Sequence, residues 1–544
     1  METPLAQKQK KFPWALLIGL LLQTPVLVTA LLGAVNLLGD FLLSFTNADY
    51  ISDTMIVGLE NYLGILDFGI PIYNTVAFFV VVLVFCIGTI VSALFISKLK
   101  TIFGVLASVA LAMFSFAAIF VNFSKVIFSS DSHGYINSVL LRLGILLRLR
   151  ILDVPVMWLK EYGAAIYLAL AIAAITAPVF IITYVFAKSG KKTVGVMTAV
   201  CAIPLLFTGT SNMALELLGY PSYHNAADWL PLFIKDFYFV HYEIGYASAA
   251  WIYLLIMYFV WCVVWCGIIF IWSIILRHIK LPQTPRKIID YIIKIIGYIL
   301  FAGTILKAVS FVLPNVIYSL NTSFKPLDEL LIVPSSFFVK RPILSNYTTY
   351  FKLVSEVVGN IDITSVLLDL CAIVMVCLIL LVPSAIGFAI LKNKKVKIGL
   401  SFIFVPWIAF LPFSLSVQNQ RLYSIYSFIT GFGAVIVFLA TYILTKSVMD
   451  AKKCKVAKII GSAICVFSTI FFVGMASVNF VIPISNEINW ITVNRMLTSG
   501  GIARAGSAMV GDALLCLFTL ATAVIPIVSF LVTYFIGDKK NKSK

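Results

Sequence analysis

Long apolar stretches alternate with short polar segments along nearly the whole chain. A helix needs about 20 apolar residues to cross a hydrocarbon core of about 30 Å, and about twelve windows of this sequence are long enough. They cover residues 14–38, 73–96, 102–121, 164–187, 193–213, 246–276, 291–320, 365–391, 398–417, 424–445, 456–478 and 507–536. The pattern therefore predicts an all-α, polytopic membrane protein with about twelve transmembrane helices.

Composition and charge agree with this interpretation. With 61% hydrophobic and 12% charged residues, a chain of 544 residues has too little polar surface for a water-soluble globule. If the N-terminus is inside, most of the 40 Lys and Arg fall in the short inside segments and most of the 23 Asp and Glu fall outside. Basic inside loops are typical of membrane proteins. We therefore expect a multi-pass protein of the plasma membrane with both termini cytoplasmic, whose net charge of +17 needs no nucleic-acid partner.

Two short sequences occur once in each half of the chain. Gly-Leu-Glu-Asn-Tyr at 58–62 and Leu-Ser-Asn-Tyr at 344–347 each precede a long apolar stretch. Gly-Tyr-Ala-Ser at 245–248 and Ala-Gly-Ser-Ala at 505–508 each open another. Offsets of roughly 285 and 260 residues indicate a duplicated unit. We predict two homologous six-helix halves, residues 1–280 and 281–544, joined by a basic, proline-bearing linker.

Further motifs extend this pattern. They are Gly-Tyr-Ile-Asn at 134–137, Ile-Gly-Tyr-Ala-Ser-Ala at 244–249, Leu-Asn-Thr-Ser-Phe-Lys-Pro-Leu-Asp-Glu-Leu at 320–330 and Lys-Arg-Pro-Ile-Leu-Ser-Asn-Tyr at 340–347. With these motifs each half resembles the permease subunit of a carbohydrate ABC importer of the maltose or glycerol-phosphate type. The Thr-Ser-Phe-Lys-Pro stretch at 322–326 is the most specific part of the resemblance.

The resemblance implies a function and a set of partners. Such a chain has an ABC type I importer permease fold and moves a carbohydrate or similar polar solute across the plasma membrane. It is not an enzyme and binds no cofactor, because ATP is hydrolysed by separate cytoplasmic ATP-binding subunits. An extracytoplasmic solute-binding protein delivers the solute in that family.

The segments expected to face the ATPase depart from the family. In the family, a loop between the fourth and fifth spans carries a Glu-Ala-Ala motif and docks on the ATPase. Here that motif is missing, and only short lysine-rich segments remain. The candidate ATPase-facing residues are Lys188, Lys191, Lys192, Lys446, Asp450, Lys452 and Lys453. Either the ATPase docks in another way or coupling is lost, which leaves two alternatives open: a permease-like scaffold or assembly factor without ATP coupling, and a secondary transporter.

Ionisable residues inside the predicted spans are candidates for the solute pathway, because a charge in the bilayer is costly unless it is paired or hydrated. The candidates for the pathway are Lys307, Asp369 and Asp512. Lys307 lies near the middle of its span, so it either pairs with an acidic residue of another helix or faces a polar cavity. We expect the structural ion pair slightly ahead of solute contact.

The nine cysteines predict no disulfide framework, because they lie in predicted spans or in a cytoplasmic loop. Cys262 and Cys266 are one helical turn apart, which is a spacing that a metal pair also uses. Packing is the expected role, because the sequence offers no third ligand nearby. Walker-type glycine loops and His-Glu-x-x-His zinc motifs do not occur in the sequence, so we expect no metal site.

Overall fold

The computed structural model describes part of the chain. The described residues are 14–49, 54–119, 135–147, 158–188, 190–208, 229–278, 283–330, 338–358, 363–391, 432–450 and 455–477, with positions 128, 210, 393, 396–397, 400, 510–511, 513–514, 517 and 525. Within them the only extended pairing is an isolated bridge between Thr46 and Ile56. The prediction of an all-helical protein is therefore confirmed for this part of the chain.

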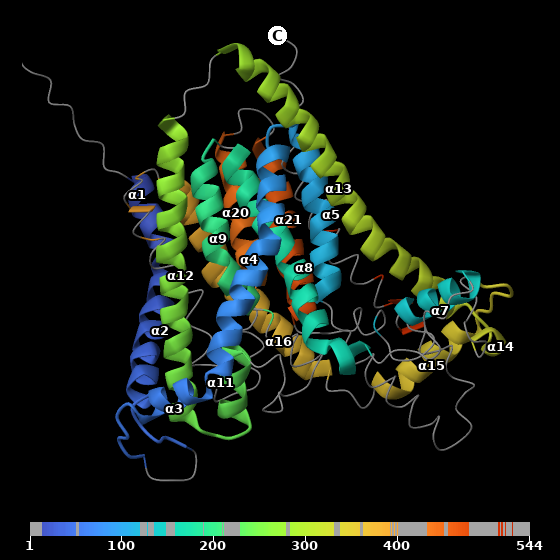
Figure 1. Cartoon of the computed structure of the whole chain (residues 1–544), viewed down its shortest axis with the longest axis horizontal. Coiled ribbons are helices and arrows are strands. Elements are labelled where there is room, and N and C mark those ends of the chain that lie inside the picture. Colours follow the sequence, from blue (N-terminus) through green and yellow to red (C-terminus); the bar gives the residue numbers. More distant parts are fainter. Residues whose placement is uncertain are drawn as a thin grey trace, which may run out of the picture. The chain divides into compact units, whose positions relative to one another are not determined.

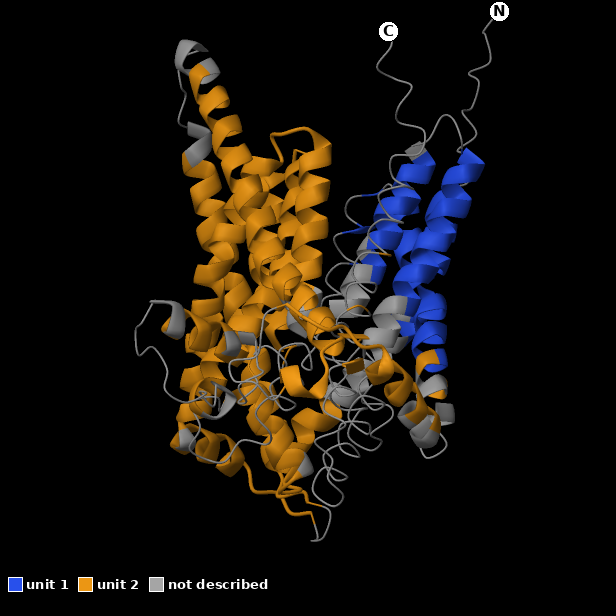
Figure 2. Cartoon of the chain, turned by 90° about the vertical axis from the view of Figure 1, so that its right-hand side faces the viewer, with its two compact units in different colours: residues 1–37, 371–471, 529–544 blue, residues 38–370, 472–528 orange. Residues whose placement is uncertain are grey.

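The helices divide into two compact units, which Figure 2 shows in different colours. Unit 1 comprises residues 1–37, 371–471 and 529–544, and unit 2 comprises residues 38–370 and 472–528. These units group residues by contact and not by sequence similarity. The duplication of the chain into homologous halves, 1–280 and 281–544, remains a prediction.

Unit 2 contains most of the described helices, labelled in Figure 1. They are α3 (Glu60–Phe68), α4 (Ile70–Ile96), α5 (Thr101–Ile119), α7 (Tyr135–Leu147), α8 (Trp158–Lys188), α9 (Lys192–Thr208), α11 (Leu230–Phe239), α12 (Ile244–His278), α13 (Gln283–Ser323), α14 (Leu327–Leu330) and α15 (Ser345–Val358). Two further helices cross a unit boundary, α2 (Thr24–Leu43) and α16 (Ile363–Val376).

Unit 1 contains α1 (Trp14–Leu21), the π-helical turn η1 (Cys377–Leu381), α17 (Val382–Ile390), α20 (Phe432–Asp450) and α21 (Lys455–Ser477). The window predicted as one first span is divided into α1 and α2. Pro25 follows the break and has no N–H with which to continue the hydrogen bonds of α1. The buried Gln23 at this break donates from Nε2 to the carbonyl oxygen of Ser384 at 2.7 Å. This hydrogen bond ties the start of the chain to α17 within unit 1.

Five described helices are long and apolar enough to cross a membrane, which is typical of a membrane protein. They are Ile70–Ile96, Glu161–Lys188, Ile244–Ile275, Ile288–Ser323 and Leu370–Ile390. Two shorter apolar helices are Thr101–Ser115 and Lys192–Thr208. The total of about twelve spans remains a prediction, since the windows at 398–417 and 507–536 lie largely outside the described residues.

α8 is the central helix of unit 2, in contact with α4, α5 and α9. Its most apolar window is 72% buried, against 11% for α12. Small side chains explain this position, because Ala171, Ala174 and Ala177 let neighbouring helices approach closely. The large apolar side chains that α12 exposes are of the kind that faces lipid.

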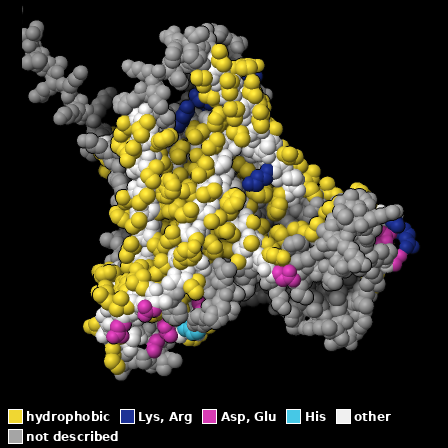
Figure 3. All heavy atoms as spheres, in the orientation of Figure 1, with side chains coloured by type: hydrophobic (Ala, Val, Ile, Leu, Met, Phe, Trp, Pro, Cys, Tyr) yellow, Lys and Arg dark blue, Asp and Glu magenta, His cyan; other side chains and the backbone are white. Residues whose placement is uncertain are grey.

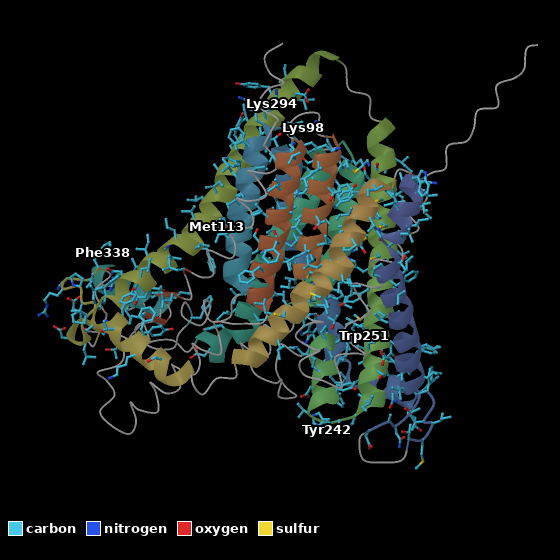
Figure 4. All side chains as sticks on the ribbon, turned by 180° about the vertical axis from the view of Figure 1, so that it is seen from behind. Lys98, Met113, Tyr242, Trp251, Lys294 and Phe338 are labelled. Carbon is cyan, nitrogen blue, oxygen red and sulfur yellow. The ribbon has the colours of Figure 1, made fainter. Side chains whose placement is uncertain are left out.

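Charged side chains in unit 2 are unevenly distributed along the helices. In Figure 3, Lys and Arg lie towards the end where α13 begins, part-way along α13 and near α14, whereas many Asp and Glu lie towards α3 and α11. Lys98 and Lys294 lie at the first end and Tyr242 lies at the other (Figure 4). Apolar side chains cover most of the surface between them. This separation of charges fits helices that cross a bilayer between two differently charged sides.

Candidate functional site

A compact polar cluster joins the end of α2 to the start of α3. The hydroxyl oxygens of Ser44 and Tyr62 lie 2.6 Å apart. Asn61 donates from Nδ2 to the carbonyl oxygens of Ser44 at 2.9 Å and Thr46 at 2.7 Å. The Tyr62 ring centroid lies 5.5 Å from that of Phe45. We call these five residues the first Asn–Tyr clamp, because one Asn–Tyr pair holds the backbone turn that ends α2.

The same arrangement recurs between α13 and α15. The hydroxyl oxygens of Ser323 and Tyr347 lie 2.7 Å apart. Asn346 donates from Nδ2 to the carbonyl oxygens of Ser323 and Lys325, at 2.9 Å each. The Phe324 and Tyr347 ring centroids lie 5.0 Å apart. These five residues form the second Asn–Tyr clamp.

The two clamps also share backbone geometry. The N–H of Val57 donates to the carbonyl oxygen of Phe45 at 2.8 Å, and the N–H of Ile343 donates to that of Phe324 at 2.9 Å. The sequence repeat at 58–62 and 344–347 is therefore a repeat in structure at these positions. The repeated structure consists of a Ser-Phe turn at the end of one helix and an Asn-Tyr pair at the start of a later helix.

The first clamp also positions the start of α12. The N–H of Gly245 donates to the carbonyl oxygen of Ala48 at 3.0 Å, and Tyr253 Oη donates to the carbonyl oxygen of Tyr62 at 3.1 Å. A Cβ atom on Gly245 would lie 1.9 Å from the carbonyl oxygen of Thr46. Only a residue without a side chain fits there.

Lys307 contacts an aromatic ring from a neighbouring helix. Its Nζ lies 4.8 Å from the ring centroid of Phe114 in α5, and Cys86 of α4 is an electrostatic neighbour. Lys307 forms no ion pair with any residue that the structure describes. A cation over a ring face is stabilised by the quadrupole of the ring. The expected Lys–Asp pair remains a prediction, because the side chains of the candidate aspartates lie outside the described part.

The structure brings neither acidic pathway candidate to Lys307. Asp369 lies in α16, and its side chain is outside the described part. Asp512 lies outside the described residues altogether. Their pathway role remains a prediction.

The connection between α8 and α9 is a tight turn. Only residues 189–191 separate the two helices, and Gly190 adopts a φ of +81°. The N–H of Lys191 donates to the carbonyl oxygen of Phe186 at 2.8 Å, which closes the end of α8 as a glycine C-cap does. The expected short first loop is therefore observed, and it contains no helix that projects towards a partner.

The lysines of this turn lie at the basic end of unit 2. Lys188 Nζ donates to the carbonyl oxygens of Ser97 at 3.1 Å and Leu99 at 2.7 Å, so it closes the end of α4. Lys192 opens α9 beside Lys98. Lys188, Lys191 and Lys192 are exposed, as an interaction with a partner or with lipid headgroups requires.

The second lysine-rich segment belongs to unit 1. Lys446 is exposed near the end of α20, and Asp450 is the last residue of that helix. Lys452 and Lys453 lie outside the described residues. Lys458 in α21 is buried, and its Nζ donates to Ser447 Oγ at 3.1 Å. This contact joins α20 to α21 across the segment.

Lys325 carries a buried charge, and the sequence analysis assigned it no role of its own. It is fully buried after the end of α13, with its Nζ 5.7 Å from the Tyr318 ring centroid. Burial and the nearby Arg142 lower the pKa of Lys325 to about 8 from its usual 10.5, and Glu329 opposes this shift. The only sequence feature that could have indicated the burial of Lys325 is its position between Phe324 and Pro326.

Stability is expected to rise with pH between about 8 and 10.5 because of Lys325. Below that range the folded and unfolded chains both carry the proton, so the full cost of burying the charge applies. Within it the folded chain releases the proton first, which relieves the cost by at most about 3 kcal/mol. The melting temperature in detergent should therefore rise across this range more in the wild type than in Lys325→Met. An equal rise in both proteins contradicts the assignment.

Comparison with protein-family models, with curated proteins and with solved structures gives no match for this chain. The resemblance to importer permeases therefore depends on the motifs in the sequence alone. The duplicated clamp, the cation–ring contact of Lys307 and the tight α8–α9 turn are the structural features from which a function can be argued.

Proposed function

We propose that this chain is the permease component of a system that moves a carbohydrate or similar polar solute across the plasma membrane. The observation that supports this most is the recurrence of the Asn–Tyr clamp in the same chain direction in both halves. Parallel repeats are one of the ways in which transporters build a shared path, with the solute site at the interface between the repeats. Each clamp fixes a helix end, so the two repeats can move as rigid bodies during alternating access.

The orientation of the chain follows from its charges. The end of unit 2 that carries Lys98, Lys188 and Lys192 is proposed to face the cytoplasm. The opposite end, with Glu60 and Glu243, then faces the exterior, where a solute-binding protein would dock. Both chain termini are cytoplasmic in this proposal.

The tight α8–α9 turn favours a second candidate function. A stable protein interface buries about 800 Å² on each partner, and a three-residue turn provides little of that area. A chain without ATP coupling, either a secondary transporter or a permease-like scaffold, explains this turn. The importer proposal requires that ATP-binding subunits dock on other surfaces of the basic end.

Purification and reconstitution separate these functions. Full-length protein in mild detergent is tested for co-purifying ATP-binding subunits and then placed in liposomes with labelled disaccharides and glycerol 3-phosphate. Uptake that needs ATP and a co-purified subunit supports the importer. Uptake that protonophores abolish supports a secondary transporter, and a stable complex without solute flux supports the scaffold.

Lys307→Met is expected to lower solute flux roughly tenfold without lowering the melting temperature, because it removes a charge proposed to face the solute path. Lys307→Arg keeps the charge over the Phe114 ring and should retain most of the flux. Lys294→Met is the matched control, since it removes a lysine near the basic end of the same helix. Unchanged flux in Lys307→Met would remove Lys307 from the pathway.

A further inference from the structure

Three thiols from two helices meet inside unit 2. Cys201 of α9 and Cys266 of α12 have their Sγ atoms 3.4 Å apart, although they are 65 residues apart in the chain. Cys262 lies one turn before Cys266 and is a further side-chain partner of Cys201. The sequence shows only the pair Cys262 and Cys266, and α9 brings a third cysteine to this pair.

The register of α9 against α12 is fixed on both sides of these thiols. Three hydrogen bonds cross between the helices: Thr193 to Ser273 at 3.2 Å, Trp261 Nε1 to the Val200 carbonyl oxygen at 3.0 Å, and Thr208 to Tyr258. Trp261 and Val200 are the immediate chain neighbours of Cys262 and Cys201. The short distance between the sulfur atoms is thus a consequence of the antiparallel helix pairing.

The geometry favours a covalent bond between thiols over metal binding. Within the described part of the chain, no group of three His, Cys, Asp or Glu residues is placed to hold a metal ion. A disulfide has an S–S distance of about 2.05 Å, so the Cys201 and Cys266 sulfur atoms need to approach by about 1.4 Å. Rotation of the two side chains about χ1 moves the sulfur atoms while the helix backbones remain in place.

We propose that Cys201 and Cys266 form a reversible disulfide between α9 and α12, and that Cys262 exchanges with it. The oxidant is a hydroperoxide. One of these two thiols reacts with ROOH to give a sulfenic acid and ROH, and the other thiol then displaces water from this sulfenic acid to form the S–S bond. The Cys262 thiol can attack the Cys201 sulfur, which gives a Cys201–Cys262 disulfide and returns Cys266 to the thiol.

The position of the thiols determines which hydroperoxides reach them. All three cysteines are half-buried, and α12 exposes large apolar side chains beside them, including Phe259 and Val263. In a membrane this surface contacts acyl chains. Hydroperoxides that dissolve in lipid therefore have a direct route to Cys201 and Cys266, whereas hydrogen peroxide has to enter from water.

The test is oxidation of the full-length protein in lipid nanodiscs with cumene hydroperoxide or hydrogen peroxide. Remaining thiols are blocked with N-ethylmaleimide, and the digest is analysed without reduction by mass spectrometry. We expect a peptide pair joined through Cys201 and Cys266 that forms at lower doses of cumene hydroperoxide and disappears on reduction. Efficient formation with hydrogen peroxide alone would show that the route is from water, and would overturn the lipid-side entry.

Variants check the assignment of each thiol. Cys201→Ser should abolish the linked peptides, whereas Cys266→Ala should shift the link to Cys201 and Cys262. Cys371→Ser, which removes an exposed thiol of unit 1, should leave the link unchanged. If a variant fails to fold, the wild-type digest alone still tests the proposal. Recovery of alkylated Cys201 and Cys266 after oxidation, or of their sulfinic acids without a link, would overturn the proposal.

Discussion

Gly245→Ala is expected to destabilise the protein by about 2 kcal/mol or more. The added methyl carbon would lie 1.9 Å from the carbonyl oxygen of Thr46 and 3.2 Å from Nδ2 of Asn61. Overpacking of this kind costs about 1–3 kcal/mol. The site cannot relax freely, because the N–H of Gly245 is bonded to Ala48 and Asn61 holds the same turn. The start of α12 has to move away from the first Asn–Tyr clamp.

The measurement is the melting temperature of the purified protein in detergent, with Gly267→Ala as the matched control. Gly267 lies in the same helix, and nothing lies within 4 Å of an added Cβ there. Alanine at that position is expected to stabilise by up to about 1 kcal/mol, because it is a better helix former. If both variants melt alike, the close approach of α12 to the clamp is wrong.

Asn61→Ala and Asn346→Ala are expected to destabilise by similar amounts, about 1–3 kcal/mol each. Each asparagine donates two hydrogen bonds to backbone carbonyl oxygens at a half-buried turn. Removing the donor leaves these carbonyl groups without this partner, and buried polar groups without partners are costly. The equality of the two effects is the test that the clamps are one repeated unit.

Tyr62→Phe and Tyr347→Phe provide a graded control. Each removes one hydroxyl contact and keeps the ring against Phe45 or Phe324, so a smaller loss of about 0.5–1.5 kcal/mol is expected. Melting temperatures of the four variants should fall into two matched pairs. A large loss for Asn61→Ala beside no loss for Asn346→Ala would show that the second clamp does not hold α13 to α15.

Some features of the fold could be predicted from local sequence. The apolar windows at 73–96 and 246–276 correspond to α4 and α12, because a stretch of that length and hydropathy forms a helix in lipid. The short segment at 188–192 is a tight turn, as its length required. Helix ends were less predictable: α13 extends beyond the apolar window at 291–320 on both sides, since polar residues continue a helix as readily as apolar ones.

The candidate site could be predicted only in part. The Asn-Tyr pairs were visible as a repeat, because the same letters recur at a constant offset. Their partners, the turns at Ser44 and Ser323, lie 17 and 23 residues away along the chain from Asn61 and Asn346, so no local pattern connects them. The contact between Lys307 and Phe114 joins two helices, and no local pattern favoured a ring over a carboxylate as the partner.

The sequence by itself determined that this protein is helical and apolar, that its charges are segregated and that short motifs recur in it, because these properties depend on composition, periodicity and spacing. Only the tertiary structure decided which groups meet. It placed Cys201 against Cys266, Lys325 in a buried position and Gly245 against Thr46. The physical reason is that such contacts depend on the register and rotation of helices distant in the chain. Packing and hydrogen bonding between those helices fix the register, and neighbouring residues in the sequence do not specify it.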